Sequence, residues 1–299
     1  MIEHASHAGN APLLRDNAIV KRHRRFPRFF RDPKAAVSVV LLICFVVLAI
    51  GSPAVAPYGE NKQNLLASHE GPSLKHLLGT DRIGRDVFSR VIYGTSTSIS
   101  VGLVAVAVAC AIGVPLGLIA GYSGRWTDEI LMRIVDAWFA FPSLILLLAI
   151  VAILGPGITN VMIAIGLGSF PIIARLVRGQ TLAVKERDYV LAARSSGAGS
   201  VRIMRSHLLP NTIQPVIVQA SLLVGFAVLT EAGLSFLGVG IKPPAATWGI
   251  VIQEGFPDIR TNVWASVGPG VAITAFVLAV NLIGDRLRDV LDPHLRGAR

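Results

Sequence analysis

The residues of this chain that could carry out chemistry are few, and most stand alone. Glu231 is an isolated carboxylate inside a mainly apolar stretch, and Arg133 and Asp136 lie three residues apart at the start of another. An ionisable side chain within such a stretch is typical of a substrate or ion pathway through a membrane. Glu231 is therefore a candidate pathway or gating residue, with structural hydrogen bonding as the alternative. Arg133 and Asp136 are spaced to pair on one helix face.

The sequence carries no motif for covalent or metal-dependent catalysis. It has no phosphate-binding G-x4-G-K-[ST] loop, no H-E-x-x-H and no G-x-S-x-G, and its seven histidines are scattered. Cys44 and Cys110 lie within apolar runs, where we expect small packing residues rather than a disulfide or metal ligands. We therefore predict no catalytic residue, no metal site and no cofactor bound by this chain.

One basic, polar stretch, Tyr189 to Pro210, stands between long apolar segments and is a candidate for binding a partner protein. Its sequence predicts a short helix, a turn and a second short helix closed by Pro210. Gly197 and Gly199 would supply the sharp turn between the two helices.

The second of these short helices is predicted to be amphipathic. Val201, Met204 and Leu208 share one of its faces, while Arg202 and Arg205 point elsewhere. A helix of about two turns is unstable by itself in water. We therefore expect it to lie in a groove on a soluble partner.

Composition places these features in a membrane protein. The 299 residues are 53% hydrophobic and only 15% charged, with a mean hydropathy of +0.61, whereas soluble domains average about 25% charged residues. The net charge of +10 comes from basic residues at the ends of apolar runs. That pattern follows the positive-inside rule and lacks the aromatic–basic repeats of nucleic-acid binding, so no nucleic-acid partner is expected.

Six apolar runs are long enough to cross a bilayer. They predict an all-α integral membrane protein with spans at 35–54, 98–120, 130–154, 158–174, 212–229 and 264–283. The remaining segments are a basic tail at 1–34, an extracytoplasmic loop at 55–97, a cytoplasmic loop at 175–211 and a tail at 285–299. The first run is too long, and its basic flank too extended, for a signal peptide, although Ala54 to Ala56 resembles a cleavage site.

The two segments flanking the first span have their own signals. In residues 21–34, seven of fourteen are Lys or Arg; with Phe26, Phe29 and Phe30 they could anchor the chain to anionic lipid, a disordered tail being the alternative. Residues 87–93 have helical spacing and predict a helix along the membrane interface. Four charged residues of this region are spaced for ion pairs on a helix surface: Asp81, Arg85, Asp86 and Arg90.

Glycine and proline positions predict where the spans pack and bend. Gly113, Gly117 and Gly121 lie on one face of the second span, which allows a neighbouring helix to approach closely. Pro142 falls inside the third span, where it should interrupt the helix. It is therefore a second candidate for a gating position.

The distribution of basic residues predicts the orientation. Six spans put both termini on one side, and that side, which includes 175–211, carries 21 of the 28 Lys and Arg residues. The opposite side carries 7, of which 5 lie in the long loop that counts little in this rule. Both termini and the 175–211 loop are thus expected in the cytoplasm.

The 175–211 loop resembles a known family. Ala192-Ala193-x3-Gly197, followed by Leu209-Pro210, is similar to the cytoplasmic loop motif of ABC-importer permeases. In that family the loop contains coupling helices that fit a cleft on an ATPase subunit. The family's initial Glu is Leu191 here, and a later apolar position is His207. Packing by the residues that match would then carry the docking more than a charged contact does.

Further motifs resemble the C-type permease subunit of dipeptide and oligopeptide (peptide/nickel) importers, over residues of about 20 to 297. They are Gly79-Thr-Asp-x-x-Gly84-Arg-Asp86, Arg133-x-x-Asp136, Ala140-Phe-Pro142, Leu234-Ser-Phe-Leu-Gly238, Pro243-Pro244 with Trp248-Gly249, and Gly284-Asp-x-Leu-Arg-Asp-x-Leu-Asp-Pro293.

The resemblance implies a type-1 ABC importer permease core at 98–284. It also implies a B-type permease partner in a pseudo-twofold heterodimer, two cytoplasmic ATPases that use ATP and Mg²⁺, and an extracytoplasmic binding protein. Two other classes remain as alternatives: an ion-coupled secondary transporter, which would need intramembrane charges and often inverted repeats, and an intramembrane enzyme, which would need catalytic residues in its spans.

Overall fold

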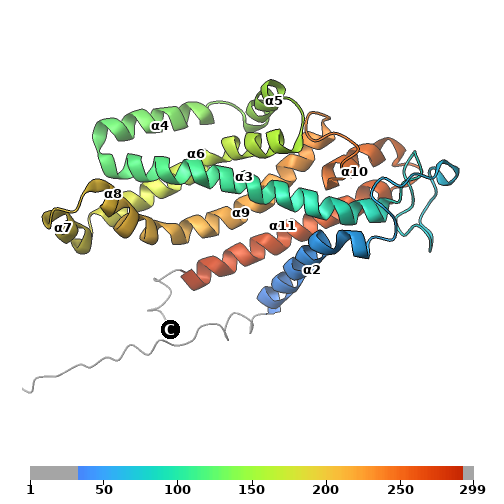
Figure 1. Ribbon diagram of the computed structural model, residues 1–299, viewed down its shortest axis with the longest axis horizontal. Coiled ribbons are helices and arrows are strands. Elements are labelled where there is room, and N and C mark those ends of the chain that lie inside the picture. The colour runs from blue at the N-terminus through green and yellow to red at the C-terminus, as the bar shows by residue number, and fades with distance from the viewer. Residues whose placement is uncertain (1–32, 292–299) are drawn as a thin grey trace, which may run out of the picture.

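A computed structural model describes residues 33–291, and nearly all regular structure within that range is helical (Figure 1). A single isolated bridge, between Thr80 and Asp86, is the exception there. The predictions for the basic tail, including Phe26, Phe29 and Phe30, concern residues outside the described range. The α-helices are α2 (Pro33–Val55), α3 (Val87–Ser123), α4 (Arg125–Phe139), α5 (Ser143–Leu154), α6 (Ile158–Lys185), α7 (Asp188–Ser195), α8 (Ser200–Ile203), α9 (Leu209–Phe236), α10 (Trp248–Gly255) and α11 (Trp264–Leu291), with short turns η1 (Leu65–Ala67), η2 (Met204–Leu208) and η3 (Phe256–Asp258).

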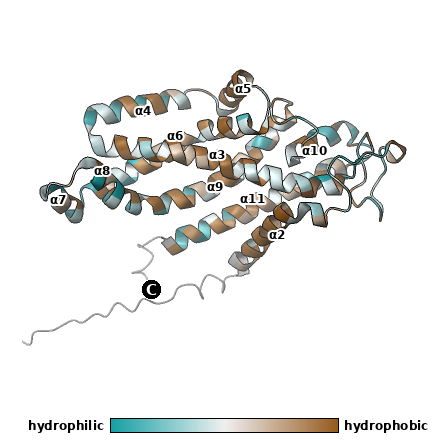
Figure 2. Cartoon of the chain, viewed as in Figure 1, coloured by the Kyte–Doolittle hydropathy of each residue, from teal (hydrophilic) through white to brown (hydrophobic). Residues whose placement is uncertain are grey.

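Five helical stretches in the described range are long and apolar enough to cross a membrane. A sixth span is present if α4 and α5, which meet at an angle of 93°, count as one broken span. Figure 2 shows apolar residues along the middle of the bundle and polar residues gathered at the α8 end. The six-span expectation is met when this bent pair is counted as the third span. The five unbroken stretches are Ala36–Val55, Val87–Ser123, Ile158–Lys185, Ser200–Phe236 and Trp264–Val290.

The predicted third span, 130–154, is two helices rather than one. Helix α4 ends at Phe139 and α5 begins at Ser143, with Pro142 between them in an extended conformation (φ −55°, ψ 127°). Proline lacks the N–H that would continue the helical ladder, so the chain can turn there. The residues on both sides of the bend are mainly apolar, and for that reason the sequence pattern predicts a single span.

Helix α3 is much longer than the predicted 98–120 span. It begins at Val87, because the Asp86 carboxylate caps it by accepting a hydrogen bond from the Ser89 backbone N–H at 2.7 Å. Residues 87–93 are thus its first two turns and pack inside the protein, which corrects the prediction of a separate interfacial helix. Helices α6, α9 and α11 likewise extend beyond their predicted apolar cores.

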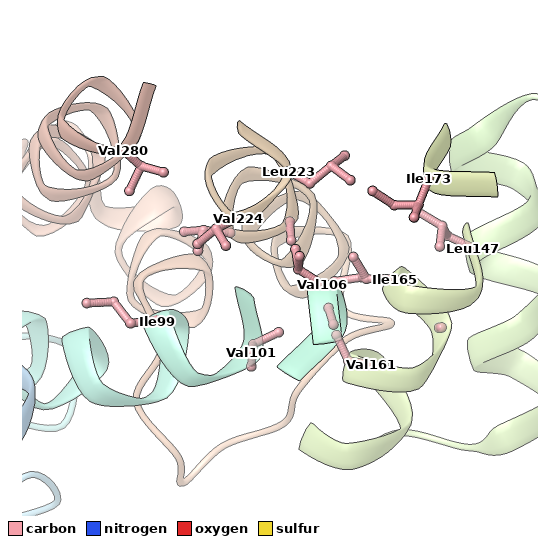
Figure 3. Packing of buried hydrophobic residues seen from close by; sticks show 14 of the residues in the cluster. Ile99, Val101, Val106, Leu147, Val161, Ile165, Ile173, Leu223, Val224 and Val280 are labelled. Carbon is pink, nitrogen blue, oxygen red and sulfur yellow. The ribbon is translucent and has the colours of Figure 1, made fainter. Parts of the chain in front are cut away.

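Helices α3 and α6 pack in backbone contact along the glycine face of α3. A Cβ atom at Gly113 would lie 2.7 Å from the Phe170 carbonyl oxygen, and one at Gly117 would lie 2.5 Å from that of Ala174. At Gly121 the nearest atom is the Thr181 Cβ, at 2.6 Å. The glycine face of α3 is therefore a helix-packing surface. Figure 3 shows the adjoining apolar core, built from α3, α5, α6, α9 and α11.

Two regions lie at opposite ends of this bundle. The α7–α8 hairpin is at one end, and α10 with the 56–86 segment is at the other (Figure 1). Since the charge count assigns the α7–α8 end to the cytoplasm, reporter fusions test the orientation. A reporter active only in the cytoplasm should signal at residue 200, and one active only outside should signal at residue 70. The reverse pattern would show that the orientation is inverted.

Candidate functional site

The α7–α8 hairpin is held in shape by its own backbone. Gly197 adopts a left-handed conformation, with φ of +80°, and the backbone N–H groups of the turn donate to carbonyls in α7: Gly197 to Arg194 and Ala198 to Ala193, each at 3.0 Å. A residue in the left-handed conformation commonly ends a helix, and glycine adopts that conformation most readily because it has no Cβ. Gly199 has φ of −67° and caps α8, so only Gly197 needs to be glycine for conformational reasons.

Helix α8 runs into α9 without a break, which corrects the prediction that Pro210 closes a separate helix. The five residues of η2, Met204–Leu208, form a π-helical turn, and Leu209 and Pro210 start α9. Proline has no N–H to donate to the preceding turn. At this junction the Asn211 side chain donates to the His207 carbonyl at 2.6 Å. The hairpin is therefore joined directly to a membrane span.

The exposed face of the hairpin differs from the predicted one. Val201 is 64% exposed, but Leu208 is fully buried and Met204 is half-buried. The π-helical turn has more residues per turn than an α-helix, so it changes which side chains face the bundle, and Ile203 and Leu208 lie in the core. Among the other predicted coupling residues, Ala192, Gly197 and Pro210 are exposed, and Ala193 and Leu209 are half-buried.

Four further exposed residues of this hairpin, which the sequence analysis did not assign to the docking surface, add apolar and cationic groups to it. Tyr189 and Leu191 are 46% and 40% exposed. Arg202 and Arg205 are also exposed, and within residues 33–291 neither forms an ion pair. Apolar and cationic groups on one protruding hairpin are suited to a protein partner with apolar and acidic groups.

Ion pairs fasten α4 to α6 near the same end. Arg178 makes a two-pronged bond to Asp128, with its Nη2 2.6 Å from Oδ2. Arg175 contacts Asp136 at 2.6 Å. The predicted pairing of Arg133 with Asp136 is thus wrong: Arg133 lies 4.0 Å from Glu129 instead. The arginines belong to α6 and the aspartates to α4, so the spacing of residues within α4 could not predict these pairs.

The two candidate pathway residues have different environments. Pro142 is exposed at the α4–α5 bend, beside a cavity of about 240 Å³ between α5 and α9. Glu231, near the C-terminal end of α9, is fully buried, so it does not line an open pathway in this conformation. The cavity is lined by Ser143, Leu144, Leu147, Phe226, Leu229, Thr230 and Gly233.

The α10 end of the bundle contains a buried charge network, whereas the spacing of the same residues in the sequence predicts surface ion pairs. Arg85 and Arg90 both contact the Glu254 Oε2 atom, at 2.9 and 2.8 Å, and Arg85 also pairs with Asp81. All four side chains are nearly or fully buried. The predicted surface ion pairs are thus a buried cluster that joins the 56–86 segment to α10. No group of three potential metal ligands occurs within the described range.

Fold and site define a class: a helical membrane protein that carries a polar hairpin on one end of its bundle. Residues 113–297 match the family model for the binding-protein-dependent transport system inner membrane component, and residues 23–72 match the N-terminal transmembrane domain of oligopeptide transport permease C. The chain belongs to the first of these families, which covers more than half of its length. It is an inner-membrane permease subunit of a binding-protein-dependent ABC importer.

Relatives are similar over nearly the whole chain. The glutathione transport system permease protein GsiD of Pectobacterium atrosepticum is 41% identical, with 95% of each chain covered. The dipeptide transport system permease protein DppC of Alkalihalophilus pseudofirmus is 40% identical, with 96% of this chain and 95% of the relative covered. A solved structure of the MetNI methionine ABC transporter in an inward-facing conformation shares the fold, with a TM-score of 0.57, 21% identity and coverage of 69% of this chain and 97% of that one.

Proposed function

We propose that this permease forms half of a translocation pathway for di- or oligopeptides or a related small solute. The support is the cargo of its relatives, which are named for glutathione, itself a short peptide, and for dipeptides. A B-type permease would supply the other half in a pseudo-twofold heterodimer. An extracytoplasmic binding protein would deliver the cargo at the α10 end.

The observation that carries the coupling role is the α7–α8 hairpin, which protrudes from the bundle and offers Leu191, Val201 and two arginines that form no ion pair within residues 33–291. We propose that one of two cytoplasmic ATPases binds this face. The ATPases would use ATP and Mg²⁺, while this chain would bind neither. Because η2 connects the hairpin directly to α9, a displacement of the hairpin would move a membrane span.

Transport would then proceed by alternating access. Closure of the ATPases would move the hairpins and favour an outward-open pathway, and ATP hydrolysis would restore the inward-open one. Such coupling requires that the ATPases bind the hairpin more tightly in one conformation than in the other. The buried Ile203 and Leu208 would transmit the movement because they pack the hairpin into the core.

Replacing Gly197 with valine should lower cargo uptake and cargo-stimulated ATP hydrolysis together, by about tenfold. A β-branched residue is strongly disfavoured at φ of +80°, so the hairpin would be reshaped. No atom lies within 4 Å of a Cβ at this position, so a steric clash would not contribute. Uptake and ATPase rates of the reconstituted complex are the measurements.

Gly199→Val is the matched control, because Gly199 also has open space but an extended backbone that valine adopts readily. It should change both rates by less than about twofold. Unchanged ATPase stimulation in Gly197→Val would contradict the coupling role. Co-purification of two ATPases would exclude the secondary-transporter alternative, whereas transport by the permease without ATPases would favour it.

A further inference from the structure

The buried carboxyl of Glu231 is surrounded by hydroxyl groups from three parts of the chain. Ser235, one turn later in α9, donates to Oε1 at 2.8 Å, and Ser98 of α3 lies 3.5 Å from Oε2. The Thr247 hydroxyl, at the start of α10, lies near the same carboxyl. Among residues 33–291 no basic side chain forms an ion pair with it. Glu231 is therefore a meeting point of α3, α9 and α10.

Each of these hydroxyls also accepts a hydrogen bond from the backbone around α10. A hydroxyl has one hydrogen, and a hydroxyl that donates it to the carboxyl presents its lone pairs to the backbone. The carboxyl thus orients the Ser98 and Ser235 hydroxyls as acceptors for backbone N–H groups. The three bonds are Ile241 to Ser235 at 3.3 Å, Trp248 to Ser98 at 3.1 Å, and Ile250 to Thr247 at 3.1 Å.

The start of α10 is also packed against the other spans. Trp248 is fully buried, with its ring centroid 5.8 Å from those of Phe45 in α2 and Phe276 in α11. Its indole N–H donates to the Val91 carbonyl of α3 at 3.1 Å. A Cβ at Gly249 would lie 2.6 Å from the Ala232 Cα, so α10 and α9 are in backbone contact. The helix has little freedom to shift by itself.

We propose that Glu231 is a positioning residue that fixes α10 to α3 and α9 at the outer end of the permease, so that these elements move as one unit. In its ionised form Glu231 suits this role because both carboxylate oxygens accept hydrogen bonds and neither donates. Glutamine would direct an NH₂ group at hydroxyls whose hydrogens point toward it. At least one hydroxyl would have to turn and release its backbone N–H. The effect on transport rests on the importer function proposed above.

Site-directed labelling tests this role in the assembled complex. Ala246 is fully buried, and a cysteine there, in a background with Cys44→Ser and Cys110→Ser, should react slowly with a membrane-impermeant maleimide added outside. Adding Glu231→Gln should raise the labelling rate and lower uptake, each by about tenfold, since one buried hydrogen bond is lost. Basal ATP hydrolysis should change less than about twofold, because the coupling hairpin is untouched.

Thr274→Ala is the matched control, because the Thr274 hydroxyl is exposed and bonds only its own helix, to the Gly270 carbonyl at 2.9 Å. It should leave labelling and uptake unchanged. Unchanged labelling in an assembled Glu231→Gln complex would overturn the proposal. If that variant fails to assemble, Ser98→Ala decides: faster labelling supports the role, and wild-type labelling overturns it. Since labelling needs no cargo, a wild-type complex that does not transport would contradict the proposed function and leave this test intact.

Discussion

Replacing Glu254 with alanine is expected to destabilise the permease by about 3–5 kcal/mol, the usual cost of removing one partner from a buried ion pair. Arg85 and Arg90 both bind the Glu254 carboxylate, and they are only 4% and 1% exposed. Without Glu254 the two cations would face each other inside the protein. Among the described residues the Nε of Arg90 lacks a hydrogen-bond partner, and without Glu254 this arginine would keep only a long bond, 3.5 Å from its Nη1 to the Asn61 Oδ1 atom. Thermal unfolding of the purified complex is the measurement.

Two further variants sharpen this prediction. Glu254→Gln keeps one acceptor oxygen and should be intermediate in stability. Glu129→Ala removes an exposed carboxylate that lies 4.0 Å from Arg133 and should change stability by at most about 0.5 kcal/mol. Equal melting temperatures for Glu254→Ala and the native complex would mean that the cluster does not hold α10 in place.

The Glu254 cluster also shows what sequence spacing cannot reveal. Arg85 and Arg90 have charged neighbours at helical distances, so surface pairing is the natural interpretation. Their decisive partner, Glu254, is 164 residues from Arg90. Only the fold places α10 against the start of α3. Glu231 is similar, since its isolation in an apolar stretch suggests a pathway, while its partners Ser98 and Thr247 come from other elements.

Long apolar runs, by contrast, make the spans predictable. Each run has to be helical in a bilayer, where every backbone group needs an internal partner, and the structure has a helical segment at every predicted run. The break at Pro142 was marked by the proline, but composition could not give the 93° bend. The sequence also cannot predict which side chains of the hairpin are exposed, because nothing in the apolar spacing of Val201, Met204 and Leu208 signals the π-helical turn.

Replacing Gly117 with valine should be the most damaging single change in the membrane bundle. A Cβ there would lie 2.5 Å from the Ala174 carbonyl oxygen and 2.9 Å from the Arg178 backbone nitrogen. These are backbone atoms of α6, so no side-chain rotation can relieve the overlap, and the two helices would have to separate. We expect a loss of at least about 3 kcal/mol, at the upper end for overpacked cores, measured as a lower melting temperature and a lower yield of assembled complex.

The same substitution at Gly179 separates this effect from valine's own helix propensity. Gly179 lies in α6 and is exposed, and no atom lies within 4 Å of a Cβ at this position. Valine is a slightly better helix former than glycine, so Gly179→Val should change stability by no more than about 0.5 kcal/mol. If the two variants melted at the same temperature, close backbone packing of α3 on α6 would not be what stabilises the bundle. A large difference between them would show that the glycine face of α3 is required because it admits the α6 backbone.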